Sequence, residues 1–299
     1  MTEQNRTPDG LVIVDKPSGF TSHDVAAKMR GIPRTRRVGH AGTLDPMATG
    51  VLVLGVEKAT KLLGHLALTE KEYLGTIRLG QNTVTDDAEG EITSSADASG
   101  VTREGIDAGV AKLTGAIMQV PSKVSAIKID GKRSYARVRG GEDFEIPARP
   151  VTVSSFQVYD VREAVAEDGT PVVDLVVSVV CSSGTYIRAL ARDLGADLGV
   201  GGHLTALRRT RVGPYGLDAA KTLDQLQEEL TVMPIADAAA TAFPRWDVDE
   251  RQAKLLTNGV RLDMPAYESA PVAVFGPDGR FVALVEEQKG KAKSLAVFG

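Results

Sequence analysis

Two long runs of β-branched residues constrain the fold of this chain more than any other feature. They occupy residues 151–161 and 172–180, and residues 167–170 between them are typical of a turn. We therefore expect two paired antiparallel strands. Residues 186–198 follow with apolar side chains at helical spacing, which predicts a helix that carries Arg188 in its first turn.

Shorter patterns before these runs predict a mixture of helices and strands. Ser22 can cap a helix that Gly31 ends, because Ser accepts hydrogen bonds from free amides at a helix start. Several adjacent strands are expected to be antiparallel, so the pattern favours an α+β fold over a doubly wound parallel sheet. Besides the helix between Ser22 and Gly31, we expect strands at 51–56 and 73–79, a helix at 102–114 and a strand at 124–129.

The composition of the chain changes near Pro244. An alanine-rich stretch between two prolines, residues 233–244, separates the main body from a tail of different texture. We therefore predict one domain over residues 1–244 and a small β-rich domain over residues 245–299. In the tail we expect a helix at 249–258 that closes on Gly259, and strands at 271–276 and 280–285 around a Pro-Asp-Gly turn.

The distribution of charge points to a nucleic-acid partner, although the net charge of the 299 residues is −4. Residues 28–40 and residues 121–141 each carry a net charge of +5, whereas residues 82–107 carry −6. A third basic cluster, Arg208, Arg209 and Arg211, has no acidic neighbour in the sequence. Because affinity for phosphate comes largely from Lys and Arg, this segregation predicts one basic face that binds RNA or DNA. The alternative is that each cluster is an ordinary solvated surface.

Several other classes of protein are not indicated by the sequence. The apolar content of 42% is that of a globular protein with a core. The first ten residues are polar and the apolar run at 11–14 is too short for a signal peptide or a membrane span, so we expect a cytoplasmic protein and no membrane partner. Cys181 is the only cysteine and the four histidines lack metal-ligand spacing. Phosphate-binding loops and dinucleotide fingerprints are missing, and we expect no cofactor and no metal.

Residues 39–52, GHAGTLDPMATGVL, place one carboxylate among small residues and turn-formers. Gly39, Gly42 and Gly50 allow backbone conformations and close approaches that a side chain would block, and Pro46 biases Asp45 towards extended dihedral angles. An acid placed in this way could face a ligand. The alternative is that the Asp-Pro pair only opens a turn.

Three further side chains could serve one mechanism with Asp45. His40 precedes it by five residues, Tyr73 lies in an expected strand, and Arg188 lies at an expected helix start. A carboxylate near a guanidinium keeps its charge at neutral pH, which keeps a nucleophile available. A base flipped out of its helix needs a flat wall, and Tyr73 could stack against it.

Seven segments of the first two-thirds of the chain occur in the order seen in the tRNA pseudouridine-55 synthase family, which the sequence therefore resembles. Residues 39–52 fit the family pattern G-H-x-G-x-L-D-P-x-A-x-G-x-L at every fixed position. The resemblance implies the pseudouridine synthase fold, with a mixed and largely antiparallel sheet. The segments are DKPSGFTS (15–22), the block at 39–52, KEY (71–73), RLG (78–80), VPSKVSAIKIDGKRSYARVRGGE (120–142), CSSGTYIRALARDLG (181–195) and LRRTRVGPY (207–215).

By this resemblance, the reaction is isomerisation of the T-loop uridine, position 55 of tRNA, to pseudouridine. The flipped uridine loses its bond from ribose C1′ to N1, the uracil turns, and C5 is joined to C1′. The resemblance implies that Asp45 is the catalytic residue, as a nucleophile or proton acceptor, and that Arg188 pairs with it. Tyr73 would stack on the uracil and take its C5 proton, whereas without the resemblance simple core packing would be the better interpretation of Tyr73.

The resemblance also implies three residues that bind the substrate. His40 would hold the flipped nucleotide or its phosphate, and Tyr186 and Leu207 would form walls of the pocket. The alternatives are a hydrogen-bonded turn histidine and two side chains packed in the core. Lys16 and Pro17 are interpreted as a structural turn at a strand end, and Val124 stands where family members commonly carry a tyrosine.

Residues 245–299 resemble a PUA domain, an RNA-binding β-barrel, only in the segment NGVRLD (258–263), a glycine-containing hairpin and their position at the end of the sequence. We therefore describe residues 1–244 as catalytic and the tail as PUA-like. The expected partner is tRNA, through its T-arm stem-loop, and the expected state is a monomer. An additional role as a tRNA-folding chaperone is compatible with the same charges, as is an RNA-binding protein without catalysis. A third alternative, a nucleoside hydrolase, would need a second acid, for which Asp86 and Asp87 are candidates.

Overall fold

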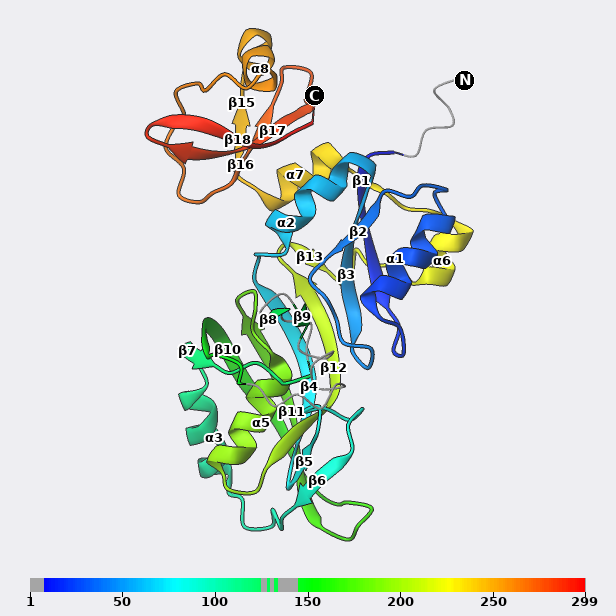
Figure 1. Cartoon of the computed structure of the whole chain (residues 1–299), viewed down its shortest axis with the longest axis vertical. Coiled ribbons are helices and arrows are strands. Elements are labelled where there is room, and N and C mark those ends of the chain that lie inside the picture. The colour runs from blue at the N-terminus through cyan, green and yellow to red at the C-terminus, as the bar shows by residue number, and fades with distance from the viewer. Residues whose placement is uncertain (1–7, 125–127, 130–131, 134–144, 299) are drawn as a thin grey trace. The chain divides into compact units, whose positions relative to one another are not determined.

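A computed structural model describes residues 8–124, 128–129, 132–133 and 145–298 of the chain, and its helices and strands are labelled in Figure 1. The described residues form two compact units. Unit 1 combines Met1–Pro46, Gly50–Thr69 and Val212–Gly299, and unit 2 combines Met47–Thr49 and Glu70–Arg211. Both units contain helices and largely antiparallel strands, which confirms the predicted α+β class.

In unit 1, two central strands are buried on both faces. Strand β1 pairs antiparallel with β3 along its whole length, and side chains alternate between the two faces of a strand. Val12 and Val14 of β1 pack with helices α1 and α6, whereas Leu11 and Ile13 belong to a second cluster on the other face. The elements are β1 (Gly10–Lys16), α1 (Ser22–Gly31), β2 (Val38–Ala41), β3 (Thr49–Val56), the 3-10 helix η2 (Glu57–Leu62), α2 (Leu63–Leu66), β13 (Tyr215–Gly216), α6 (Leu223–Glu228), β14 (Met233–Pro234) and α7 (Ile235–Ala242).

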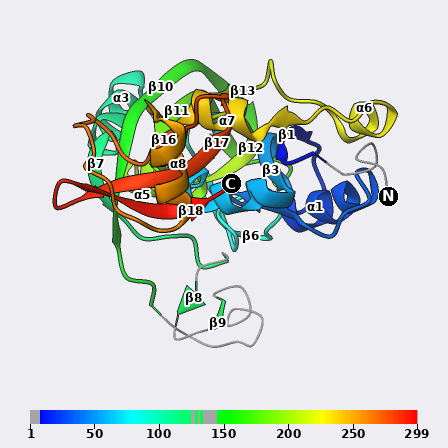
Figure 2. The same ribbon diagram turned by 90° about the horizontal axis from the view of Figure 1, so that it is seen from above.

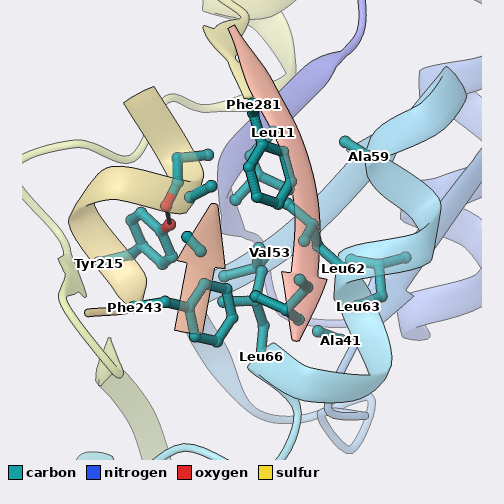
Figure 3. Close-up of a cluster of buried hydrophobic side chains, with 14 of the residues drawn as sticks. Leu11, Ala41, Val53, Ala59, Leu62, Leu63, Leu66, Tyr215, Phe243 and Phe281 are labelled. Atoms are coloured by element: carbon teal, nitrogen blue, oxygen red, sulfur yellow. Dashed lines mark hydrogen bonds between the residues drawn. The ribbon is translucent and has the colours of Figure 1, made fainter. Parts of the chain in front are cut away.

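The second cluster joins the beginning and the end of the chain in one hydrophobic core (Figure 3). Leu11 and Val53 from the first strands meet Phe281 from the C-terminal sheet there. Helix α7 lies in the alanine-rich stretch that the sequence suggested as a separator, and its Ala238 is buried in this cluster. The hydroxyl of Tyr215 donates a hydrogen bond of 2.9 Å to the carbonyl oxygen of Ala238.

The C-terminal part of unit 1 is β-rich, as predicted. Its four strands follow the order β15-β16-β17-β18, with one parallel pair, β15 with β16, and two antiparallel pairs. Helix α8 packs on the sheet through Ala253 and Leu256 (Figure 2). The elements are β15 (Arg245–Asp247), α8 (Glu250–Thr257), β16 (Val272–Phe275), β17 (Phe281–Gln288) and β18 (Lys291–Val297).

Unit 2 is built on a sheet with strand order β12-β4-β11-β10-β7. The two β-branched runs form β10 and β11, which pair antiparallel as predicted, although β10 is longer than the expected 151–161. Helices α3 and α5 lie side by side against this sheet (Figures 1 and 2). The elements are β4 (Lys71–Leu79), β5 (Gln81–Thr83), β6 (Ile92–Ser95), α3 (Arg103–Lys112), β7 (Gly115–Gln119), β8 (Lys128–Ile129), β9 (Lys132–Arg133), β10 (Arg149–Val165), β11 (Pro171–Cys181), α5 (Ile187–Asp197) and β12 (Gly202–Val212).

The cap of α1 differs from the prediction, and the strand expected at 124–129 lies partly outside the described residues. The prediction that Ser22 caps α1 is wrong, because Thr21 is the cap: its hydroxyl accepts from the Asp24 amide at 3.1 Å, and the Asp24 carboxylate accepts from the Thr21 amide at 2.9 Å. The Ser22 hydroxyl instead forms hydrogen bonds with the backbone of Leu44. Of the strand expected at 124–129, residues 125–127 lie outside the described part of the chain, and residues 128–129 form β8.

Candidate active site

Asp45 lies, half-buried, in the loop that follows β2 and precedes β3. Gly42 and Gly50 flank it with φ angles of 72° and 99°, in the left-handed region that side chains disfavour. The predicted need for glycine at these two positions is therefore confirmed. Leu44, directly before Asp45, is only 3% exposed and anchors the loop in unit 1.

The backbone is held on both sides of Asp45 by segment 16–22, which ends β1 and begins α1. Before Asp45, the buried Ser22 hydroxyl accepts a hydrogen bond of 2.9 Å from the Leu44 amide and donates one of 3.3 Å to the Leu44 carbonyl. After Asp45, the Pro46 carbonyl accepts hydrogen bonds from the Gly19 amide at 2.9 Å and from the Lys16 ammonium at 3.1 Å. These bonds restrict the position of the carboxylate before any substrate arrives.

The Lys16 side chain is fully buried, which is rare for a lysine. Its ammonium also donates to the carbonyl oxygens of Pro17 at 2.9 Å and Phe20 at 2.6 Å. Three carbonyl dipoles thus compensate for the water that the charge loses on burial. Strand β1 ends at Lys16, as predicted for a structural turn at a strand end.

His40 lies in β2, five residues before Asp45, and contacts a second histidine. The rings of His40 and of His23, from α1, are arranged edge to face with centroids 5.3 Å apart. Nothing in the spacing of the four histidines indicated this pair, because its members belong to different elements that only the fold brings together.

In unit 2, Tyr73 and Leu207 lie on neighbouring strands. Tyr73 is buried on the face of β4 that also carries Lys71 and Gly75. Leu207 lies on β12, which pairs with β4, and its Cδ1 would be in ordinary van der Waals contact, at 3.6 Å, with a Cβ at Gly75. The structure therefore brings Leu207 against the strand that carries Tyr73, and the two side chains could together form an apolar wall.

Arg188 is buried in unit 2, with 4% exposure, in the first turn of α5. Its guanidinium donates hydrogen bonds to the carbonyl oxygens of Thr85 at 2.8 Å and Val124 at 3.0 Å, and it lies 3.4 Å from the Asp87 carboxylate. Asp87 is itself buried and accepts further hydrogen bonds from the Thr85 hydroxyl at 2.5 Å and the Glu89 amide at 3.0 Å. The sequence indicates Asp87 only as a candidate hydrolytic acid and does not predict this buried ion pair with Arg188.

Tyr186, the residue before α5, occupies the N-cap position of that helix and is half-buried. It therefore lies two residues from Arg188, at the same helix start. Within unit 2 the structure thus groups Tyr186 with Arg188 on one element and Tyr73 with Leu207 on adjacent strands. His40 and Asp45 belong to unit 1.

The basic clusters differ from one another in the folded chain. In the cluster at 208–211, which has no acidic neighbour in the sequence, Arg209 is fully buried. Arg211 forms ion pairs with Glu70 at 3.0 Å and Glu72 at 3.2 Å. That part of the predicted basic face is wrong, because the compensating acids lie about 140 positions away in sequence. Most of the cluster at 121–141 lies outside the described residues.

The cluster at 28–40 is exposed, as a surface for phosphate would be. Lys28 and Arg34 line a pocket of about 480 Å³ together with residues of α6, among them Leu223 and Gln227. Asp224 also lines this pocket, so the pocket carries charges of both signs.

Burial changes the acid-base behaviour of Lys71. Loss of water around its ammonium, together with the nearby charge of Arg209, lowers the pKa of Lys71 from 10.5 to about 8. Burial also raises the pKa of the neighbouring Cys181 thiol to about 11, so this thiol is not reactive at neutral pH.

Among the described residues, no group of three or more His, Cys, Asp and Glu side chains is arranged to hold a metal ion. In the same part of the chain, no helix has the length and apolar character needed to cross a membrane. Unit 1 thus supplies one carboxylate on a restrained backbone, and unit 2 supplies a buried tyrosine, a neighbouring leucine and a buried guanidinium.

Comparison with known families gives three consecutive matches along the chain. Residues 30–187 match the family described as TruB family pseudouridylate synthase (N terminal domain). Residues 188–239 match the tRNA pseudouridylate synthase B C-terminal domain, and residues 243–299 match the family described as tRNA Pseudouridine synthase II, C terminal.

Curated relatives are similar over the whole chain. A tRNA pseudouridine synthase B of Streptomyces griseus subsp. griseus is 89% identical, with 100% of both chains covered. A protein of the same name from Thermobifida fusca is 58% identical over 97% of this chain and 98% of its own.

A solved structure supports the fold. The chain resembles one in a Cbf5-Nop10-Gar1 complex with a TM-score of 0.72 and 24% identity, over 100% of this chain and 87% of the other. At this level of identity the likeness concerns the architecture alone.

Proposed function

The chain belongs to the TruB family of pseudouridylate synthases, and from this membership we propose that it converts the T-loop uridine at position 55 of tRNA to pseudouridine. That it is an isomerase that changes uridine in tRNA to pseudouridine follows from the family and from full-length relatives, one of them 89% identical. We propose, beyond this, which uridine in tRNA is converted and by which mechanism. In it, the uridine is flipped out of its stack, the bond from C1′ to N1 breaks, the uracil turns, and C5 bonds to C1′ as it gives up its proton.

The observation that carries the mechanism is the restrained backbone on both sides of Asp45. A group that meets a transient reaction centre must be held close to its productive position, because small displacements are costly in rate. We propose that Asp45 acts on the ribose or the base as a nucleophile or proton acceptor. A single carboxylate suits an isomerisation, since the base stays in the site and no water has to be activated as in glycoside hydrolysis.

We propose that Tyr73 stacks on the uracil and takes its C5 proton, and that Leu207 and Tyr186 complete the pocket. The support is that Leu207 lies on β12, beside the strand β4 that carries Tyr73, and close to Gly75 of that strand. A flipped base is bound by stacking against such aromatic and apolar side chains.

Arg188 is proposed to act beside Asp45 and to keep that carboxylate ionised, and His40 to hold the flipped nucleotide or its phosphate. The support for Arg188 is its burial and its fixed guanidinium, which three protein groups hold. A guanidinium held in this way has little freedom to move when the negative charge of the reaction shifts.

We propose that the substrate contact is the T-arm stem-loop and that exposed basic residues of cluster 28–40 bind its phosphates. We also propose that the protein is a monomer and lies in the cytoplasm. A role as a tRNA-folding chaperone is proposed in addition, and it predicts that a catalytically inactive protein still speeds tRNA folding.

Release of tritium from C5-labelled uridine in a tRNA transcript tests the reaction. We expect wild-type protein to release one tritium per tRNA, and Asp45→Asn to release none while its affinity for tRNA stays within about twofold. Asp107→Asn, which removes an exposed carboxylate of α3, is the matched control and should keep the wild-type rate. Turnover by Asp45→Asn close to wild type would refute the assignment.

The hydrolase alternative is less well supported. Asp86 and Asp87, its candidate second acids, form ion pairs with Arg192 at 3.2 Å and Arg188 at 3.4 Å. Each of these carboxylates is therefore already engaged by an arginine side chain. Free uracil among the products would nevertheless establish hydrolysis.

A further inference from the structure

A buried glutamine at the end of β7 contacts the helix start that carries Arg188. Gln119 is 2% exposed, and none of the roles described above uses its side chain. Its carboxamide oxygen accepts a hydrogen bond of 2.8 Å from the Tyr186 amide, and its carboxamide nitrogen donates one of 3.1 Å to the Tyr186 carbonyl. Both hydrogen-bonding groups of one backbone residue are thus held by one side chain, 67 positions away in sequence.

Tyr186 is the point at which α5 begins. Its carbonyl oxygen also accepts the first hydrogen bond of the helix, from the Leu190 amide at 3.2 Å. In the described structure no side chain at the N-cap caps this helix, so the usual local device for fixing a helix start is replaced by Gln119. The hydrogen bonds of Gln119 therefore hold the backbone of the residue at which α5 begins.

Residues 119–124 reinforce this contact along the helix. The Val120 carbonyl accepts a hydrogen bond of 2.7 Å from Arg192, one turn further along α5, and the Val124 carbonyl accepts one of 3.0 Å from Arg188 itself. Gln119 fixes the backbone of the helix start, and the carbonyl five residues later fixes the guanidinium. A shift of Tyr186 would therefore move Arg188 relative to its acceptors.

We propose that Gln119 is a positioning residue for the isomerisation, which holds the first turn of α5 and, through it, the guanidinium of Arg188. This inference rests on the proposed function, because it assumes that Arg188 acts in the reaction. Gln119 itself makes no contact with the reacting uridine in this proposal. Its effect is on the chemical step and is transmitted by Arg188.

Gln119→Met keeps the length of the side chain and removes both hydrogen bonds, and Gln119→Glu keeps the acceptor for the Tyr186 amide but loses the donor to its carbonyl. The exposed Gln157 of β10 offers a matched control, Gln157→Met. For Gln119→Met, we expect the single-turnover rate constant on tRNA to fall about 10- to 100-fold, as for a small misplacement of a reacting group. The Kd for tRNA should stay within about twofold, and Gln119→Glu should have an intermediate rate.

A double-mutant cycle with Arg188→Lys separates positioning from a general structural effect. If Gln119 acts through Arg188, Gln119→Met should cost less than about twofold when Arg188 is already Lys. An equal loss in both backgrounds would overturn the inference, as would a wild-type rate for Gln119→Met. Loss of the folded state in both Gln119 variants, detected by circular dichroism, would show a purely structural role and would also overturn it.

The same experiment distinguishes this inference from the proposed function. A normal rate for Arg188→Lys would remove Arg188 from the mechanism, whatever Gln119 does. An impaired Arg188→Lys together with a fully active Gln119→Met would leave the proposed function standing and would reject the positioning role alone.

Discussion

Replacement of Ser22 by alanine tests whether the hydrogen bonds around Asp45 matter for the reaction. In Ser22→Ala the Leu44 amide and carbonyl lose the hydroxyl that contacts both. Leu44 is buried, so water does not readily replace the lost partner, and a buried polar group left unsatisfied costs about 1–3 kcal/mol. A typical free energy of unfolding is about 5–15 kcal/mol, so the variant should fold with a lower melting temperature.

We expect Ser22→Ala to lower the rate of the reaction by more than its loss of folding stability alone would cause. Because Asp45 directly follows Leu44, a small displacement of the loop should lower the single-turnover rate constant about 10- to 100-fold. Thr21→Ala is the matched control: it removes the neighbouring hydroxyl, whose bond to the Asp24 amide caps α1, at a cost of about 1 kcal/mol. Thr21 contacts α1 and not the Asp45 loop in the hydrogen bonds described above.

The assay is tritium release under single-turnover conditions, with thermal melts of the same preparations. We expect both variants to melt earlier than wild type and only Ser22→Ala to react slowly. A wild-type rate for Ser22→Ala, together with the expected loss of stability, would refute the reasoning that segment 16–22 positions Asp45. Equal rate losses in both variants would refute it as well.

Three further predictions concern other parts of the molecule. Asp87→Asn removes the negative charge that lies 3.4 Å from the buried Arg188 guanidinium; breaking such a buried pair costs about 3–5 kcal/mol, and chemical denaturation should detect this loss. Replacement of Lys28 and Arg34 by Gln should weaken tRNA binding and flatten the slope of log K against log salt by about 0.7 to 0.9 for each lost phosphate contact; an unchanged slope would exclude these residues from the RNA interface. Between pH 8 and 10.5 the folded chain holds Lys71 deprotonated while the unfolded chain keeps that proton, so the unfolding free energy of wild type should rise with pH relative to Lys71→Met. A constant or falling difference over this window would contradict the lowered pKa.

Local sequence patterns were sufficient for part of the framework around the site, although the strands β2 and β12, which carry His40 and Leu207, were not predicted. The β-branched runs gave β10 and β11 as an antiparallel pair, and the apolar spacing after them gave α5 with Arg188 in its first turn. These features depend on neighbours in the sequence, where periodicity is informative. The glycines around Asp45 were also interpretable, because a left-handed φ is a property of a single residue.

The partners of the site residues could not be predicted in the same way. Asp87 and Arg188 are about 100 positions apart, and the Arg211 ion pairs with Glu70 and Glu72 span a still longer distance in sequence. Their pairing depends on strand order and on which side chains are left buried together, and neither is encoded in a local period. The assignment of the α1 cap failed by one residue because Ser22 and Thr21 both have capping hydroxyls, and only the distant Leu44 distinguishes their roles.

The most direct test of the account is position-resolved detection of pseudouridine in an unmodified tRNA transcript treated with the wild-type chain or with Asp45→Asn. The account predicts complete conversion at position 55 by wild type, and no conversion by a folded, tRNA-binding Asp45→Asn. Conversion at position 55 by Asp45→Asn, or none there by wild type, would contradict it.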